Sequence, residues 1–409
     1  MVKTRWYDGY NVMALRGFKE KECFFVIDKY SETAGETSRK RNTSAVNKDL
    51  CKHNATYTPI FPYRKTKFVE NIFDKDTLKF HNHFKNPCFA QTQRCKVSDG
   101  TVTEQQRLRC IPYFYIIGFP KCATTDLWDR LLLHPHIVAK HDKESHYIDD
   151  KRFNNQWSFD KYLDYFSLTA DAISELCENI LDRGDTQCNI ITGEATANTA
   201  AVNDLWYMLP ENKGCTEPRI TNPDYLYNIN PEMRLIALIR DPVERLWSDY
   251  LYLAKYFNYK TSPESFHQHT VDAIAIYDDC LKYFTHRGCA YNESIGSIQM
   301  RLRMGIYDIH VSDWLRIFPR KQLLIVRTED YKKNTSVVLQ RVFEHLDIDF
   351  PSKEIYEQMI MKSEKNVNIK SMDMLSETRE ILYKFYAQSY ENVASILQDS
   401  NLVLKKPDG

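Results

Sequence analysis

The segment Gly118–Thr125, GFPKCATT, combines residue types that bind an oxyanion. It lies between an apolar run, residues 111–118, and the predicted start of a helix. Backbone N–H groups at a helix N-terminus, the Lys121 ammonium and the hydroxyls of Thr124 and Thr125 together favour a bound phosphate. The segment is not a Walker A loop, because GxxxxGK[ST] does not occur, and no carboxylate after a strand is evident as a magnesium ligand. The alternative interpretation is an ordinary strand–helix turn with a surface lysine.

A second string, RDPVERLWSDY, follows another apolar run, residues 234–239. Arg240 stands at the carboxyl end of this run, where open α/β sheets bind their ligands. Ser248 follows eight residues later, about two helical turns along. The alternative is that Arg240 only forms an ion pair with Asp241 or Glu244.

The elements that must hold these strings follow from hydrophobic pattern and helix caps. Asp241 suits an N-cap and Pro242 the first helical turn. Buried-type strands are predicted at 111–118, 189–192, 234–239 and 322–326, and helices at 126–134, 242–256, 334–346 and 374–397. Strands that alternate with helices predict an α/β fold, with a central, mostly parallel sheet between two helical layers.

Composition excludes some classes of protein. The chain has 409 residues, and its 55 Lys and Arg balance its 55 Asp and Glu, which argues against a nucleic-acid coat protein. Residues 1–107 are polar and irregular, especially Ser31–Lys52, and are predicted to form an N-terminal stem. Residues 108–409 carry the regular pattern and are predicted to form one domain.

The cysteines and glycosylation sequons indicate a compartment. Eleven cysteines show no zinc-type spacing, and sequons occur at Asn42, Asn54, Asn292 and Asn334. Met1–Lys21 contains neither a secretory apolar core nor an anchor-length apolar run. Two interpretations stay open: a cytosolic protein, or a luminal one whose targeting segment is not in this chain. Cysteines and sequons favour the second.

Together the two strings resemble a known family. PKCATT is similar to the 5′-phosphosulfate loop of sulfotransferases, and RDPVERLWSDY to their 3′-phosphate motif, about 120 residues further along. The resemblance continues through GEATANT, the pair Cys280 and Cys289, and MGIYDIHVSDWLRIFP. About 300 residues, from Arg109 to the last predicted helix, resemble the Golgi carbohydrate sulfotransferases.

The resemblance implies a three-layer αβα, P-loop-like nucleotide-binding fold, with 108–409 as the catalytic domain. It also implies the cofactor 3′-phosphoadenosine 5′-phosphosulfate (PAPS), with no metal required. Lys121 would stabilise the charge that builds on the bridging oxygen as the nucleotide leaves. The loop residues would bind the 5′-phosphate, and the second motif the 3′-phosphate. The cofactor-binding residues are therefore expected to be Lys121, Cys122, Ala123, Thr124, Thr125, Arg240 and Ser248.

The string KESHY, residues 143–147, resembles the Lys-Glu-x-His stretch of the heparan and chondroitin enzymes, in which the glutamate is the base. Glu144 is therefore expected to be the general base and His146 a supporting catalytic residue. In a strand or extended loop, residues i and i+2 face the same side, so both side chains could reach one pocket. The alternative is a solvated, charged turn beside His141 and Asp142.

Two residues depart from the family pattern. Ala123 stands where glycine is usual, and its methyl group would cost on the order of 1 kcal/mol if φ is positive there. Ser145 stands where proline is common, which affects how Glu144 is oriented. Neither change removes a charged or nucleophilic group, so an active enzyme is expected.

Other residues are expected near the site. Glu194, in GEATANT, is expected to border the acceptor groove. Lys362, Lys365 and Lys370 could close over the nucleotide or meet a polyanionic acceptor, or could belong to a solvated loop.

The cysteines can also be assigned. Cys122 is expected to stay free, because a disulfide would distort the phosphate loop. The first pairs to test are Cys280–Cys289 and Cys88–Cys95.

The resemblance also implies a substrate and a location. The expected acceptor is a glycosaminoglycan, most closely the 6-hydroxyl of 4-sulfated N-acetylgalactosamine in chondroitin or dermatan sulfate, and no nucleic acid. The expected location is the Golgi lumen or the exterior, with the family's membrane anchor absent from this chain. Two other functions stay open: a nucleotide kinase or ATPase on a similar scaffold, and a catalytically silent glycan-binding relative.

Overall fold

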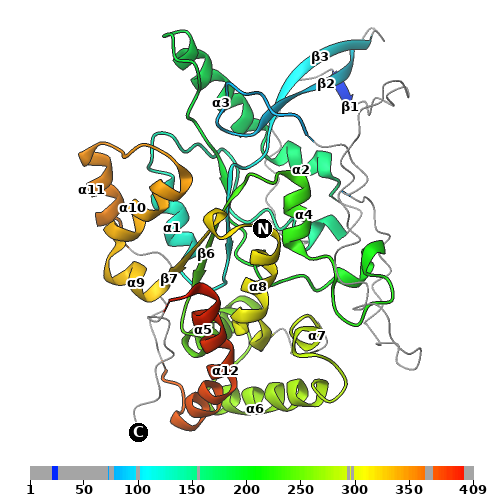
Figure 1. Cartoon of the computed structure of the whole chain (residues 1–409), viewed down its shortest axis with the longest axis vertical. Helices are drawn as coiled ribbons and strands as arrows, with labels where there is room; N and C mark the ends of the chain where they lie inside the picture. The colour runs from blue at the N-terminus through cyan, green and yellow to red at the C-terminus, as the bar shows by residue number, and fades with distance from the viewer. Residues whose placement is uncertain are drawn as a thin grey trace, which may run out of the picture. The chain divides into compact units, whose positions relative to one another are not determined.

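A parallel sheet of four short strands organises the larger of two compact units in the computed structural model (Figure 1). The structure describes residues 21–25, 72, 78–97, 102–153, 157–292, 295, 299–363 and 372–399. Within the sheet the strand order is β5-β4-β6-β7. The strands are β4 (Phe114–Gly118), β5 (Gly193–Glu194), β6 (Arg234–Ile239) and β7 (Leu323–Arg327).

Every pair of neighbouring strands in this sheet is parallel, so the carboxyl ends of β4 and β6 lie at one edge. Tyr115 pairs with Leu235, and Leu235 with Leu323. All of β4, and all of β6 after Arg234, is buried, as expected when helices cover both faces. Figure 1 shows helices α1 and α10 to one side of the strands and α4 and α8 to the other. The predicted α/β class is confirmed.

The helices occupy most of the segments between and after the strands. They are α1 (Thr124–Leu131), α2 (Phe159–Tyr165), α3 (Ser167–Leu181), α4 (Asn222–Ile229), α5 (Pro242–Phe257), α6 (Pro263–Cys280), α7 (His286–Ala290), α8 (Tyr307–Ile317), α9 (Thr328–Lys333), α10 (Thr335–Leu346), α11 (Lys353–Met361) and α12 (Ser376–Leu397). Short 3-10 turns lie at Lys151–Phe153, Trp206–Met208, Pro210–Asn212, Leu302–Gly305 and Arg320–Gln322. None of the helices in the described residues is both long and apolar enough to cross a membrane.

Local sequence explains where several elements begin. The Asp241 side chain caps α5 by accepting from the backbone N–H groups of Val243 and Glu244, as predicted. Asn334 caps α10 in the same way, through the N–H of Val337. Strand β6 begins and ends at the residues that the apolar run predicts.

One predicted strand lies a few residues away from its expected place. The structure puts β5 at Gly193–Glu194 rather than at 189–192, because Ile191 forms only an isolated bridge with Ile137. A Cβ atom at Gly193 would lie 2.3 Å from the Phe114 ring, so this approach of β5 to β4 requires glycine.

The smaller unit includes the described residues 21–25, 90–97 and 102–108, and with them most of a three-stranded sheet in the order β1-β2-β3. Its strands are β1 (Lys21–Phe25), β2 (Cys88–Val97) and β3 (Val102–Cys110), and β1 pairs antiparallel with β2. These strands correct the expectation that residues 1–107 are irregular. Polar side chains dominate β3, so it lacks the hydrophobic alternation that would have predicted a strand. The domain boundary near residue 107 stays a prediction.

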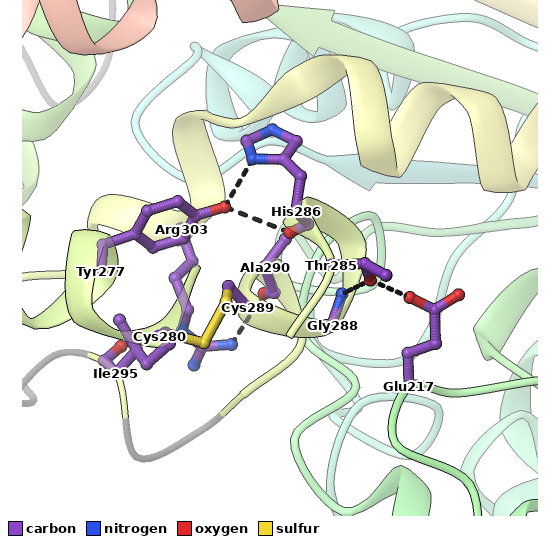
Figure 2. The surroundings of a disulfide bond; sticks show 10 residues. All are labelled: Glu217, Tyr277, Cys280, Thr285, His286, Gly288, Cys289, Ala290, Ile295 and Arg303. Carbon is purple, nitrogen blue, oxygen red and sulfur yellow. Dashed lines mark hydrogen bonds between the residues drawn. A yellow bond between two sulfur atoms is a disulfide. The ribbon is translucent and has the colours of Figure 1, made fainter. Parts of the chain in front are cut away.

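The disulfides agree with one predicted pair and overturn the other. Cys280 is bonded to Cys289, with 6.0 Å between their Cα atoms (Figure 2). Cys88 is bonded to Cys110 rather than to Cys95, so the second predicted pair is wrong. Cys95 lies seven residues along the same strand, about 23 Å from Cys88, too far for a disulfide.

A third disulfide joins Cys177 at the end of α3 to Cys188. Cys122 is free and buried, as predicted.

Candidate active site

The loop between β4 and α1 folds into a tight cradle at the carboxyl end of the sheet. Lys121 and Ala123 both have φ 66°, in the left-handed region. Ala123 is the N-cap residue of α1, so the amides of the first turn open toward the loop. The expected strain at Ala123 is therefore real, and its methyl group costs on the order of 1 kcal/mol relative to glycine.

Cys122 points away from this cradle. Its Sγ lies 3.6 Å from the carbonyl oxygen of Pro120 and 3.9 Å from the Tyr307 hydroxyl. Burial raises the pKa of the Cys122 thiol to about 12, so it stays protonated. The whole residue is buried, and its carbonyl accepts from the Thr328 hydroxyl at 3.1 Å.

Arg240 lies beside this loop, as the parallel pairing of β4 and β6 requires. Its Nη1 is 3.5 Å from the carbonyl oxygen of Lys121. The predicted ion pair with Glu244 also forms, at 3.6 Å, but Glu244 is shared with Arg379 at 2.7 Å. Arg240 therefore forms the ion pair with Glu244 and also lies at the carboxyl end of β6, and its binding of a ligand stays a prediction.

A cavity of about 690 Å³ opens over these two loops. Its lining includes the predicted residues Lys121, Ala123, Thr124, Thr125, Glu144, His146, Arg240 and Ser248. Residues about 120 positions apart in the sequence thus line the same cavity. Its volume is within the range of small-ligand sites. Cys122 and Lys362 are not part of the lining, and Lys365 and Lys370 lie outside the described residues.

Glu144 and His146 reach the cavity together from the loop that precedes the turn at 151–153. His146 Nε2 lies 3.7 Å from Glu144 Oε2, and Lys143 Nζ lies 2.6 Å from Glu144 Oε1. Both Glu144 (φ 69°) and His146 (φ 54°) are left-handed, so the predicted strand-like alternation is wrong. The two side chains meet because the loop turns at each of these residues.

Charge pairing sets the protonation of both side chains. Burial alone would raise the pKa of Glu144, but hydrogen bonding to His146 and the charge of Lys143 outweigh it and lower that pKa to about 2. Burial opposes charge on His146, yet Asp149 at 3.0 Å and Glu144 together raise the His146 pKa to about 10. At neutral pH the loop therefore presents an ionised carboxylate beside a protonated imidazole.

Ser145, the second departure from the family pattern, anchors this loop. Its backbone N–H and its hydroxyl both donate to Glu194 Oε1 at 3.1 Å. The backbone N–H and the hydroxyl of Thr196 also donate to Glu194. Glu194 is 2% exposed and does not line the cavity, so the expectation that it borders the acceptor groove is wrong. Glu194 instead anchors the loop that carries Glu144 and His146. Proline at position 145 would have neither the backbone N–H nor the hydroxyl that donates to Glu194.

Lys121 extends into the cavity toward α5. Its Nζ lies 4.0 Å from the centre of the Tyr252 ring, within cation–π range. Burial lowers the pKa of Lys121; Asp249 opposes this shift, and Arg301 and Arg240 add to it. Arg301 and Arg240 therefore add positive charge near the Lys121 ammonium, which favours an anionic ligand.

Several lining residues were not predicted from the sequence: Lys143, Asn198, Tyr252, Tyr256 and Arg301. A signal existed for two of them, because Tyr252 and Tyr256 follow Ser248 at intervals of four on one helix face. Arg301 gave no such signal, since its contacts at the site, with Asp249 and Asn198, join segments far apart in the sequence. No cluster of metal-ligating side chains occurs among the described residues.

Residues 112–390 match the sulfotransferase domain family, a range that includes both loops and the Glu144 segment. The chain belongs to this family. The matched range contains the parallel sheet and the two loops at its edge, and it ends within α12.

The chain is similar to carbohydrate sulfotransferase 15 of Mus musculus and of Homo sapiens, each 35% identical over 315 residues. The match covers 73% of this chain and 55% of each relative, so the chain spans about half the length of these relatives. Among solved structures, a sulfotransferase from Alicyclobacillus acidocaldarius is 19% identical, with a TM-score of 0.44, and the match covers 70% of this chain and 96% of that one.

Proposed function

We propose that the chain is a PAPS-dependent carbohydrate sulfotransferase. The observation that carries this proposal is the shared cavity, which brings Lys121 and the phosphate-loop threonines together with Arg240, Ser248 and Glu144. A nucleotide with a second phosphate on its ribose needs two separate anion sites, and the loops after β4 and β6 would supply them.

The residues present fit the cofactor. The loop amides, Thr124 and Thr125 would hold the 5′-phosphate, and Arg240 with Ser248 the 3′-phosphate. When bound, the cofactor supplies the sulfuryl group. Lys121 would place its ammonium where negative charge grows as the bridging oxygen leaves, an interaction that is stronger in the transition state than in the ground state.

Glu144 would take the proton of the acceptor hydroxyl. Its low pKa reflects pairing with Lys143 and His146, and we infer that an entering hydroxyl takes the place of Lys143 on a carboxylate oxygen. Loss of the Lys143 contact would raise the pKa of Glu144 and make it a stronger base at the moment of transfer. His146, held by Asp149, would keep the carboxylate oriented.

The proposed acceptor is the 6-hydroxyl of 4-sulfated N-acetylgalactosamine in chondroitin or dermatan sulfate. The similarity to carbohydrate sulfotransferase 15 supports a sugar acceptor. We place the protein in the Golgi lumen or outside the cell, because three disulfides in the described residues favour an oxidising compartment.

Two measurements test the proposal. Calorimetry should show binding of adenosine 3′,5′-bisphosphate in the presence of EDTA, with much weaker binding of ATP; the reverse preference would contradict the cofactor assignment. Transfer of labelled sulfate from PAPS should then be measured over a panel of desulfated and 4-sulfated polymers. Binding of the bisphosphate without transfer to any polymer would leave a catalytically silent relative.

A further inference from the structure

Helix α5 carries a row of side chains along the cavity. Ser248, Tyr252 and Tyr256 recur every fourth residue, and all three line the cavity. Tyr252 is 45% exposed and Tyr256 70% exposed, although both are large aromatic residues. Their ring centres lie 6.3 Å apart with an interplanar angle of 25°. The two rings form an exposed, nearly parallel tyrosine wall.

This wall begins where the proposed chemistry takes place. The Lys121 ammonium lies 4.0 Å from the Tyr252 ring. Burial raises the pKa of the Tyr252 phenol, the charge of Glu144 raises it further, and Arg301 opposes the shift. Lys121 is thus in contact with the Tyr252 ring, Glu144 and Arg301 line the same cavity, and Ser248 lies one turn nearer the nucleotide loops. A ligand on the wall lies further along α5 than Ser248, away from the N-terminus of the helix and the Arg240 loop.

Arg301 supplies positive charge at this end of the cavity. Its Nε donates to Asp249 Oδ2 at 2.8 Å and its Nη2 to Asp249 Oδ1. The remaining Nη1 lies 3.5 Å from Asn198 Oδ1, another lining residue. Asp249 is also bound by the buried Arg245, at 3.1 Å, so two guanidinium groups share one carboxylate and leave an excess of one positive charge.

Arg301 is held in place before any ligand binds. Its backbone carbonyl accepts from Arg245 Nη2 at 2.9 Å. Two residues on, Arg303 donates to the carbonyl oxygens of Ala290 and Ile295, next to the Cys280–Cys289 disulfide (Figure 2). The segment that carries Arg301 is thus tied to a cross-linked turn, and such preorganisation favours ligand binding.

We propose that Tyr252, Tyr256 and Arg301 form the acceptor subsite and that it binds an anionic sugar. The pyranose ring lies on the tyrosine wall, and its anion, a sulfate on that ring or the carboxylate of a neighbouring uronate, pairs with Arg301. Planar guanidinium groups suit such oxyanions, and rigid aromatic surfaces suit the apolar face of a ring. The inference rests on the proposed function and adds the residues that would choose the substrate.

The test compares KM values of variants for 4-sulfated and fully desulfated chondroitin. We expect Arg301→Gln to raise the acceptor KM about 10- to 100-fold, as loss of a hydrogen bond to a charged group predicts, with the KM for PAPS unchanged. A rise confined to the 4-sulfated polymer identifies the sulfate as the partner of Arg301, whereas equal rises for both polymers identify the uronate. Unchanged KM values for both acceptors, or a rise in the KM for PAPS instead, would overturn the proposal that these residues form the acceptor subsite.

Tyr256→Ala gives a second, independent arm, because Arg301→Gln leaves the buried Asp249 with fewer partners and can unfold the chain. Tyr256→Ala should raise the KM for both polymers about 5- to 10-fold, and Tyr283→Ala, an exposed tyrosine outside the cavity, should change neither. If the wild type transfers no sulfate, the proposed function fails on its own. Calorimetric binding of a 4-sulfated oligosaccharide, with and without Tyr256→Ala, then decides the subsite: weaker binding by the variant supports it, and equal binding or none by the wild type overturns it.

Discussion

Ser145→Ala tests how the base-carrying loop is held. The change removes one hydroxyl that donates to the buried Glu194 at 3.1 Å and that also accepts from the Tyr147 N–H at 3.3 Å. Loss of a buried hydrogen bond to a carboxyl group predicts a destabilisation of about 1 to 3 kcal/mol. The backbone N–H of Ser145 and the two Thr196 donors still reach Glu194, which keeps the loss within this range.

The same change should reduce turnover. Glu144 and His146 flank Ser145, and a shift of the loop by a fraction of an ångström misplaces both. We expect kcat to fall between about 10- and 100-fold, while the KM for PAPS stays the same, because the phosphate loop is not touched.

Urea unfolding and steady-state kinetics check this prediction. Ser174→Ala is the matched control: that hydroxyl also lies within reach of a glutamate, Glu178, at 3.4 Å, but on the exposed surface of α3. The control should lie within about 0.5 kcal/mol of the wild type. If Ser145→Ala is as stable and as active as the control, Glu194 does not anchor the loop and the reasoning is refuted.

Three further predictions concern the cradle, the pH dependence and the cysteines. Ala123→Gly, which relieves a left-handed alanine, should raise the free energy of unfolding by about 0.5 to 1 kcal/mol and should not weaken bisphosphate binding; a loss of stability in urea unfolding would contradict the strain. The folded-state pKa of His146 is raised to about 10, so its contribution to stability is complete below its ordinary pKa near 6.5 and is lost as pH rises toward 10. The free energy of unfolding should therefore fall over this pH range, and His146→Gln should make the fall shallower. An unchanged pH dependence in the variant would refute the pairing of His146 with Asp149. Non-reducing peptide mapping should recover a peptide in which Cys88 is linked to Cys110. Cys122 should be a free thiol that reacts with iodoacetamide only after unfolding, because burial raises its pKa to about 12. Rapid labelling of Cys122 in the folded protein would contradict that burial.

Local patterns predicted the frame of the site well. The apolar run 234–239, the Asp241 cap and the two motif loops needed only neighbouring residues, and parallel pairing of β4 and β6 then joined the loops at one edge. Contacts between distant segments were not predictable in this way. Glu194 was expected in the groove, but it turns inward because four donors from Ser145 and Thr196 satisfy it there.

Other parts of the site depended on geometry that a single sequence does not encode. Glu144 and His146 meet because both have left-handed backbones, which are uncommon for residues other than glycine, so alternation along a strand was the wrong argument. Cys88 pairs with Cys110 because strands β2 and β3 bring them together, and the polar sequence of β3 hid that strand. Arg301 enters the cavity through Asp249, a partner 52 residues away.

We propose that one cavity holds both the cation and the base of sulfate transfer. The most direct test is transfer of labelled sulfate from PAPS to 4-sulfated chondroitin by the purified chain and by Lys121→Ala and Glu144→Gln, with Lys255→Ala on the exposed side of α5 as the control. We predict at least about a 100-fold loss of kcat in the first two variants, wild-type turnover in the control, and unchanged bisphosphate affinity in Glu144→Gln. Full activity of folded Lys121→Ala and Glu144→Gln would contradict the account.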